Sequence, residues 1–502
     1  MKSRQAIRAI AGVLLCGGGL WLALPSPYRE QTYIINACGC RMETVIVEKP
    51  GGVVQGSMVL FHGISANRKI MSYLARGFAE QGLRVYVPDL PGHGRTAGPF
   101  SPARAEQCGE ALVSELLTRG AISRSRMILG GHSMGGAIAV RIASRVPVAG
   151  IIAISPAPMR AAHGVTPEKL LFSDPPILPA NSLVMIGGLE LASMRENAAD
   201  LVTSSADGTS KYLEIPRVSH VSILFGSAGM RAAQDWSAHL LGLPPANRLP
   251  SHAPLAGALA GFAGILLIAG PFLRETVGKK NREEAVTTGA SLGVPRLFLE
   301  FAVGAILVVL LLRSWIPLKG IGLFQGDYFA SFLLLLGAAL IAVHWKTICA
   351  AFAGSPRQLL ACAFAGLVLL LLITAWLDLT FYEAWLTAAK WAHFPLLLVV
   401  LLPYHVAEET LLGPIVAGKK WRRLALALSL RLITWGALMV GVLFLHSGEI
   451  LMGLLSVYMA LFNMIQRSAM DVVRNETGSA AATALFGAII QAGFCLVIFP
   501  IT

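Results

Sequence analysis

The chain has 502 residues, of which 55% are hydrophobic and only 14% are charged. This composition excludes an entirely soluble protein, because a water-facing surface requires more ionic groups, so a large part of the chain is expected to lie in lipid. The formal net charge of +13 comes from short Lys/Arg clusters between apolar stretches. We therefore attribute it to membrane topology and expect no nucleic-acid partner.

The N-terminus carries three basic residues, Lys2, Arg4 and Arg8, followed by an apolar run over 9–24. This pattern suits a cleaved signal peptide or an uncleaved signal anchor, and we favour the anchor, with residues 1–27 forming a transmembrane helix. Because the basic end stays in the cytoplasm, the chain that follows is expected to emerge on the outer face.

Residues 28–246 change to a soluble α/β alternation. Short β-rich apolar runs are separated by stretches with helical spacing, and they occur at 32–36, 44–48, 57–61, 83–87, 127–130, 150–155, 182–186 and 212–215. The first two runs predict a hairpin, and the later ones predict buried parallel strands joined by crossover helices. The expected fold class is α/β, with a mostly parallel sheet and flanking helices.

Residues 247–502 predict an all-α membrane region of about eight helices, or nine spans with the anchor. The apolar segments approach the ~20 residues that a bilayer requires and lie at 255–273, 297–316, 328–345, 358–377, 391–412, 424–445, 449–465 and 479–500. Basic residues gather in alternate loops, including a predicted cytoplasmic loop with Arg467 and Arg474. This bias predicts a multi-pass inner-membrane protein whose soluble domain faces an extracytoplasmic space.

Seven cysteines occur without a CxxC pair or a zinc-binding pattern, so no metal is expected. Cys38, Cys40 and Cys108 fall in the soluble region. A pair among these three is expected to be oxidised if that region lies outside the cytoplasm, with unpaired structural thiols as the alternative.

The segment Gly131-His132-Ser133-Met134-Gly135 follows a predicted strand and precedes a helix rich in small residues. A G-x-S-x-G turn of this kind holds a serine at its apex, where the hydroxyl can act as a nucleophile once a base removes its proton. Upstream, a strand ends in His62-Gly63-Ile64. We expect the backbone N–H groups of Ile64 and Met134 to form an oxyanion hole, and we interpret His62 either as part of that loop chemistry or as a loop histidine bonded to the backbone.

Two segments resemble the α/β-hydrolase family of serine esterases and lipases. Val85-Tyr86-Val87-Pro88-Asp89-Leu90-Pro91-Gly92-His93-Gly94-Arg95 looks like the stretch after the family's fourth strand, and Gly-His-Ser-Met-Gly-Gly looks like its nucleophile elbow. The resemblance implies a triad in the chain order Ser, acid, His and no cofactor. Asp89 and His93 are expected to be structural.

The resemblance also assigns the two partners of Ser133. Glu190, three residues past Gly187, follows a predicted strand as the family's acid does, with Asp174 and Asp200 as competing carboxylates. His220 follows the last predicted strand and is expected to be the general base.

A short connection, 156–181, leaves little chain for a lid. An open pocket near lipid favours an ester, thioester or related acyl substrate, either a small molecule or a lipid, with membrane lipids as further partners. The sequence does not indicate an oligomeric state.

Ionisable residues also lie within the predicted spans. Tyr404–Leu412 contains His405, Glu408 and Glu409, with Arg431, His446 and Asn463 on or beside later spans. This pattern resembles the type II CAAX-prenyl-protease-like membrane family, although Gly413 stands where that family has arginine. Two interpretations follow: the membrane region is the working part, in peptide cleavage, lipid handling or transport, with the hydrolase accessory or binding-only, or the glutamates pair with Arg431 or the 419–423 cluster.

Overall fold

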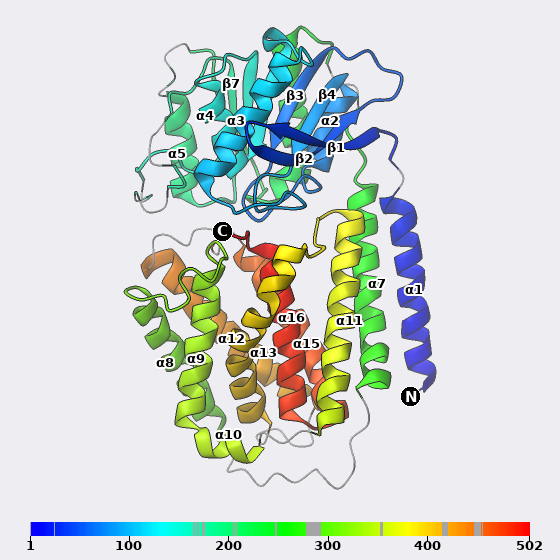
Figure 1. Cartoon of the computed structure of the whole chain (residues 1–502), viewed down its shortest axis with the longest axis vertical. Coiled ribbons are helices and arrows are strands. Elements are labelled where there is room, and N and C mark those ends of the chain that lie inside the picture. The colour runs from blue at the N-terminus through cyan, green and yellow to red at the C-terminus, as the bar shows by residue number, and fades with distance from the viewer. Residues whose placement is uncertain are drawn as a thin grey trace. The chain divides into compact units, whose positions relative to one another are not determined.

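A computed structural model of the chain describes residues 2–502 except 25, 164, 166, 168–169, 173–175, 204, 206–207, 246–247, 278–292, 352–354, 414–419, 446–452 and 454. Its residues fall into two compact units (Figure 1). The α/β unit comprises Trp21–Ala258, Leu377–Ala384 and Pro500–Thr502. The helical unit comprises Met1–Leu20, Leu259–Trp376 and Trp385–Phe499.

The α/β unit is built on one 8-stranded sheet with the order β1-β2-β4-β3-β5-β6-β7-β8. β1 and β2 pair antiparallel, β2 pairs antiparallel with β4, and all other neighbours are parallel. The predicted fold class is therefore confirmed. The strands are β1 (Arg29–Ala37), β2 (Cys40–Glu48), β3 (Gly56–Phe61), β4 (Leu83–Pro88), β5 (Met127–His132), β6 (Gly150–Ile154), β7 (Ser182–Gly187) and β8 (Lys211–Ile215).

The predicted hairpin is also present, and its turn explains its register. Ala37 pairs with Cys40, which leaves a two-residue loop of Cys38 and Gly39. Both loop residues have positive φ, 45° and 77°. A two-residue turn with this backbone matches the right-handed twist of the strands.

Helices cover both faces of the sheet. α2 (Ser72–Glu80) and α6 (Ser227–Leu241) bury Phe78 and Met230 in a core with strand residues such as Met58. α3 (Pro102–Thr118) and α4 (Met134–Ala143) pack on the other face, where Gly109 lies against Phe61. A further helix, α5 (Ala192–Thr203), packs against β7 and β8.

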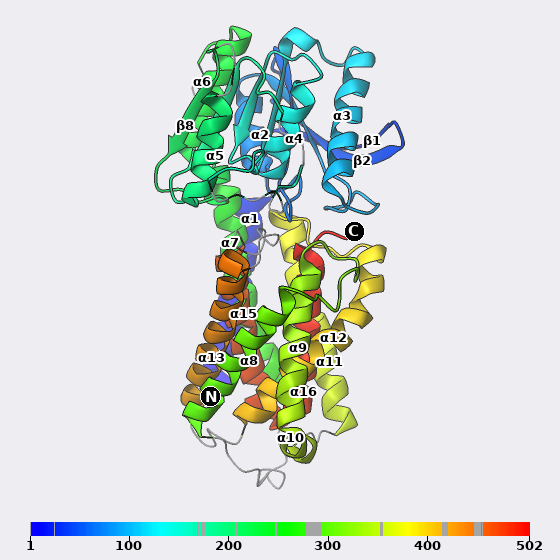
Figure 2. The same cartoon turned by 90° about the vertical axis from the view of Figure 1, so that its left-hand side faces the viewer.

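The helical unit consists mainly of long apolar helices, shown from a second side in Figure 2. They are α1 (Lys2–Ala23), α7 (Ala253–Thr276), α8 (Val294–Leu312), α9 (Gly326–Val343), α11 (Pro356–Thr380), α12 (Ala388–Leu412), α13 (Lys420–Val440), α15 (Ser456–Thr477) and α16 (Ala480–Ile498), with a shorter α10 (Trp345–Ala351). Among the described residues, 8 helices including α1 are long and apolar enough to cross a membrane. By length and composition these helices fit the predicted membrane region.

The prediction for the ninth span needs a correction. The predicted span 449–465 falls partly outside the described residues, and its residues from Ser456 onward lie in α15, which continues to Thr477. Arg467 and Arg474 therefore lie in a helix, not in a loop, and Arg467 is only 1% exposed. Because α15 carries several charged residues, it is less apolar than the 8 helices that qualify as candidate membrane spans.

Small residues bring the long helices close together. A Cβ atom added to Gly12 on α1 would lie 2.7 Å from the Gly264 carbonyl oxygen on α7. A Cβ on Gly337 of α9 would lie 2.3 Å from the Tyr404 backbone nitrogen on α12. Close backbone approach at small residues is typical of helix packing in lipid, where apolar burial provides no driving force between helices.

Two of the three cysteines in the α/β unit are joined. Cys40 on β2 and Cys108 on α3 form a disulfide across a sequence separation of 68, and Cys38 is free and exposed. One of the two expectations for these cysteines, an oxidised pair, is thus realised in the structure.

This pairing predicts a specific stability effect. Replacing both Cys40 and Cys108 by Ser should lower the free energy of unfolding by about 2–4 kcal/mol, because the unfolded chain regains the entropy that the cross-link removes. Chemical denaturation of the full chain in detergent, followed by tryptophan fluorescence, measures the change. The matched control is Cys38→Ser, which should leave stability unchanged; equal stability of the two variants would contradict the pairing.

Candidate active site

The carboxyl ends of the parallel strands carry the polar residues of the site. Ser133 follows β5, Ser155 follows β6, Glu190 lies three residues beyond β7, and His220 follows β8. Because neighbouring parallel strands end at the same edge of a sheet, residues far apart in sequence meet there.

Ser133 occupies a strained turn between β5 and α4. Its φ of 54° and ψ of −119° lie outside the regions that non-glycine residues normally adopt. The turn is possible because glycines flank it: a Cβ on Gly131 would lie 2.2 Å from the Gly135 carbonyl oxygen, and a Cβ on Gly135 would lie 2.3 Å from the Phe61 carbonyl oxygen. The half-buried serine is thus held at the end of β5.

Glu190 and His220 meet as a hydrogen-bonded pair. The distance from His220 Nδ1 to Glu190 Oε2 is 2.7 Å. Glu190 Oε1 accepts hydrogen bonds from the Gly187 N–H, at 2.9 Å, and from the Ser155 hydroxyl. Burial opposes ionisation of Glu190, but these hydrogen bonds, with that from His220 the strongest, outweigh it and hold the pKa of Glu190 below its usual value. The carboxylate is therefore ionised and able to orient the imidazole.

The competing carboxylates differ in their surroundings. Asp200 on α5 is exposed and contacts Nε2 of His163, not His220. Asp174 lies outside the described residues. Of the carboxylates that the structure describes, Glu190 is the one bonded to His220.

The predicted oxyanion groups lie on both sides of the serine. Met134 is the first residue of α4 and directly follows Ser133. Gly63, just before Ile64, lies so close that a Cβ there would be 3.0 Å from Ser133 Cβ. Outside helices and strands, the described part of the chain shows no backbone hydrogen bond donated by the Ile64 or Met134 N–H.

Two buried residues were missed by sequence reasoning. Ser155, with φ of 43°, bonds Glu190, and its N–H donates to the Met185 carbonyl. His132 Nε2 lies 2.7 Å from the His220 carbonyl oxygen, and the two rings are 4.7 Å apart. Burial lowers the pKa of His132 to about 3, so its imidazole is neutral and Nε2–H donates. These contacts hold Glu190 and His220 in place, and their only sequence signal is that each residue lies at or just after the end of a strand.

Three further residues of the α/β unit are structural. His62 Nδ1 lies 2.8 Å from the Gly63 carbonyl oxygen and Nε2 accepts the Leu90 N–H at 2.9 Å, so the interpretation of His62 as a loop histidine bonded to the backbone is confirmed. Asp89 accepts the N–H groups of Arg68 and Arg95, and His93 Nδ1 contacts the Pro91 carbonyl oxygen. The structural roles predicted for Asp89 and His93 are confirmed.

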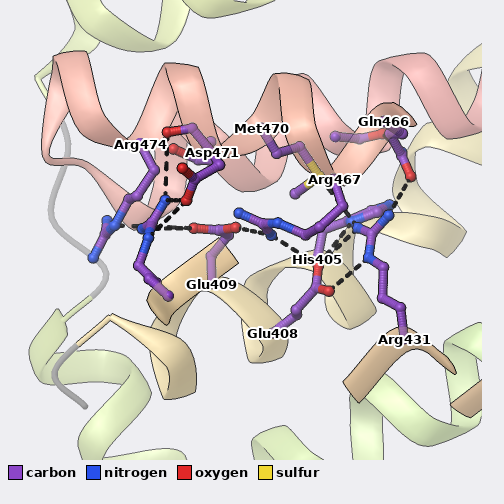
Figure 3. Close-up of polar contacts among 12 residues, drawn as sticks. His405, Glu408, Glu409, Arg431, Gln466, Arg467, Met470, Asp471 and Arg474 are labelled. Carbon is purple, nitrogen blue, oxygen red and sulfur yellow. Dashed lines mark hydrogen bonds and ion pairs between the residues drawn. The ribbon is translucent and has the colours of Figure 1, made fainter. Parts of the chain in front are cut away.

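The second cluster of ionisable residues lies in the helical unit (Figure 3). Arg431 on α13 donates to both oxygens of Glu408 on α12, at 2.7 and 2.8 Å. Glu409 pairs with Arg467 of α15. The predicted pairing of Glu408 with Arg431 is confirmed, and α15 supplies a partner that the sequence did not indicate.

The surroundings of these glutamates are those of an ion-pair network. Arg431 also bonds Gln466 at 2.7 Å, and Arg423 bonds Asp471 at 2.9 Å. His405 Nδ1 lies 3.9 Å from Glu408 Oε2, beyond hydrogen-bond distance. Over the described residues no group of three His, Cys, Asp or Glu side chains is arranged to hold a metal, and His446 lies outside them. Buried glutamates paired in this way tie neighbouring helices together, because removing one partner would leave an uncompensated buried charge.

The sheet order, the strained serine turn and the acid–histidine pair define an α/β-hydrolase domain of the esterase and lipase type. Residues 58–270 match the α/β hydrolase family. Lipase 1 of Psychrobacter immobilis is 30% identical over 105 residues, 21% of this chain and 32% of the lipase. Esterase YjfP of Escherichia coli K12 is 28% identical over 132 residues, 24% of this chain and 51% of the esterase. The predicted resemblance is confirmed.

The chain spans at most about half the length of these two curated relatives. Among solved structures, a predicted CIB-like hydrolase from Thermoplasma acidophilum is 19% identical, with a TM-score of 0.33, and covers 43% of this chain and 100% of its own.

The buried imidazoles predict a loss of stability in acid. Burial lowers the pKa of His62 to about 4, whereas an unfolded imidazole titrates near 6.5. Below about pH 6.5 the folded form therefore binds fewer protons than the unfolded form. The free energy of unfolding is not reduced by His62 above that pH, and it decreases as the pH falls toward 4. At about 1.4 kcal/mol per pKa unit, His62 alone removes roughly 3 kcal/mol by pH 4.

Denaturation of the full chain in detergent between about pH 7 and 4.5 tests this sign. His62→Gln should reduce the dependence of the unfolding free energy on pH. His239→Gln, at an exposed position of α6, should leave it unchanged. An identical pH dependence in wild type and His62→Gln would show that His62 is not the titrating group.

Proposed function

We propose that the chain is a membrane-anchored serine hydrolase that cleaves an ester, thioester or related acyl bond through an acyl-enzyme on Ser133. His220 serves as the general base, Glu190 as the orienting acid, and the N–H groups of Ile64 and Met134 as the oxyanion hole. The observation that carries this proposal is the buried Glu190–His220 pair, 2.7 Å between Oε2 and Nδ1, at the sheet edge where Ser133 ends β5.

The chemistry follows from these positions. His220 Nε2 removes the Ser133 proton as Oγ attacks the acyl carbon, and Glu190 stabilises the imidazolium that forms. The oxyanion accepts hydrogen bonds from the two N–H groups. His220 then donates the proton to the departing alcohol or thiol, and a water molecule activated by the same histidine releases the acid and regenerates Ser133. Each step uses only groups of the chain and water.

The proposed substrate is an ester or thioester of a small molecule or a lipid. The partial relatives are a lipase and an esterase, which supports this class of bond. The substrate would come from the bilayer or from its surface, because the hydrolase domain is continuous with helices apolar enough to cross a membrane.

We place the hydrolase domain outside the cytoplasm, on the inner membrane. Three separate segments of the chain form the α/β unit: 21–258, 377–384 and 500–502. Four long helices, α7, α8, α9 and α11, separate the first two, and four more, α12, α13, α15 and α16, separate the last two. An even number of crossings returns the chain to the same side, which supports counting α15 as a span, and the disulfide favours an oxidising compartment.

Covalent labelling tests the nucleophile. A fluorophosphonate should label the folded wild-type chain, and Ser133→Ala should abolish the label, because this reagent reacts with an activated serine. Glu190→Gln should lower kcat by about 10³–10⁴-fold, since the histidine loses its orienting charge. Asp200→Asn is the matched control and should keep wild-type activity. An unlabelled but folded wild type would refute the catalytic role.

Reporter fusions test the topology. A periplasmic reporter such as alkaline phosphatase, fused after Gly242, should be active, because the predicted anchor places this residue outside. The same reporter fused at Arg282, in a predicted cytoplasmic loop, should be inactive and serves as the control. The reverse pattern would overturn the proposed orientation.

A further inference from the structure

A short segment that comprises the end of α11 and the residues after it belongs to the α/β unit. Residues Leu377–Ala384 are part of the α/β unit, although more than a hundred residues of membrane-type sequence precede them. Phe381 and Tyr382 pack against the core that α2 and α6 form with the sheet. The segment is therefore a component of the domain that carries Ser133.

Tyr382 contacts the loop that provides one proposed oxyanion group. Its hydroxyl donates to the Ser65 carbonyl oxygen at 2.8 Å. Ser65 directly follows Ile64 and has a φ of 58°, a backbone conformation that needs support from its surroundings. Burial and the nearby charge of Asp89 raise the pKa of the Tyr382 phenol, so it remains a donor at physiological pH.

Glu383 holds the other end of the same loop. It is 3% exposed, and its Oε1 accepts from Arg68 Nε at 2.9 Å and lies 2.6 Å from Nη2. The Arg68 backbone N–H is bound in turn by Asp89 at 2.8 Å. Residues 65 and 68 are thus fixed by neighbours on the segment, and the Ile64 N–H lies just before them.

The carboxyl groups of Glu383 and Asp89 face each other. A Cβ on Gly94 would lie 2.4 Å from both Asp89 Oδ2 and Glu383 Oε2. Burial and the Asp89 charge raise the pKa of Glu383 to about 8, so near neutral pH Glu383 carries a proton that it can share with Asp89. Glu383 therefore binds Arg68 in the loop after β3 and lies beside Asp89 in the loop after β4, and its proton avoids two adjacent buried negative charges.

We propose that Tyr382 and Glu383 are positioning residues for the oxyanion hole, so that a segment between two membrane helices completes the hydrolase. This inference rests on the proposed function of Ser133 and Ile64. Transition-state stabilisation requires the Ile64 N–H at hydrogen-bond distance from the developing oxyanion, and small displacements of such a donor cost much of the rate.

The test compares three variants of the full chain in detergent: Tyr382→Phe, Glu383→Ala and Glu383→Gln. Tyr382→Phe and Glu383→Ala should each lower kcat for a short p-nitrophenyl ester by about 10- to 100-fold with little change in KM, and slow fluorophosphonate labelling in parallel. Glu383→Gln has the shape of the protonated acid and should restore most of the activity.

Tyr28→Phe is the matched control, because Tyr28 also donates a half-buried hydrogen bond in the α/β unit, to Glu80 at 2.7 Å, away from this loop. It should keep wild-type kcat. Wild-type kcat and labelling rate in Tyr382→Phe would overturn the inference while leaving the proposed function intact.

Amide hydrogen exchange provides a readout that does not depend on activity. Peptides covering residues 62–71 should exchange faster in Tyr382→Phe than in wild type or Tyr28→Phe, and unchanged exchange would also refute the inference. If wild type hydrolyses no ester and takes no label, the proposed function fails, and the exchange data alone then decide whether Tyr382 fixes the loop.

Discussion

The contact between the first turn of α4 and the ends of β3 and β5 is the constraint on which the site depends. A Cβ on Gly131 would collide with the Gly135 carbonyl, and a Cβ on Gly135 would collide with the Phe61 carbonyl, so neither position has room for a side chain. The same tight turn holds Ser133 in its unusual backbone conformation and close to the loop at Gly63. A larger residue at Gly135 would move the helix away from β3 and separate the serine from that loop.

Much of the hydrolase domain could be predicted because its chemistry follows the order of its strands. Ser133, Glu190 and His220 each follow a strand, and a parallel sheet brings these ends together whatever the loop lengths between them. The position of Glu190 after β7 predicted that it would meet His220, and the structure shows this contact. Ser155 and His132 escaped prediction because the geometry around them, not the local sequence, decides that they contact Glu190 and His220.

In the helical unit the sequence indicated the cluster of ionisable residues. It predicted Arg431 as the partner of a glutamate but not Arg467, which pairs with Glu409. Glu408 and Arg431 stand out against apolar surroundings, whereas Arg467 follows a weakly apolar stretch that was predicted to end at 465. α15 is polar on the side that meets α12, so hydropathy alone underestimates its length. The same charges that obscure the helix in the sequence hold it in the bundle, because a buried carboxylate needs a cationic partner.

The α/β unit is assembled from segments that lie far apart in the chain, and this has a consequence for biosynthesis. A ribosome delivers residues 21–258 first, but Glu383 and the C-terminal Ile501, whose carbonyl accepts the Phe100 N–H, arrive much later. Domains generally fold in the order in which they are made. The contacts of Arg68 with Glu383 and of Phe100 with Ile501 therefore form only after the helices that precede these partners, α11 and α16, have been synthesised. A chain truncated before α16 would lack the second contact.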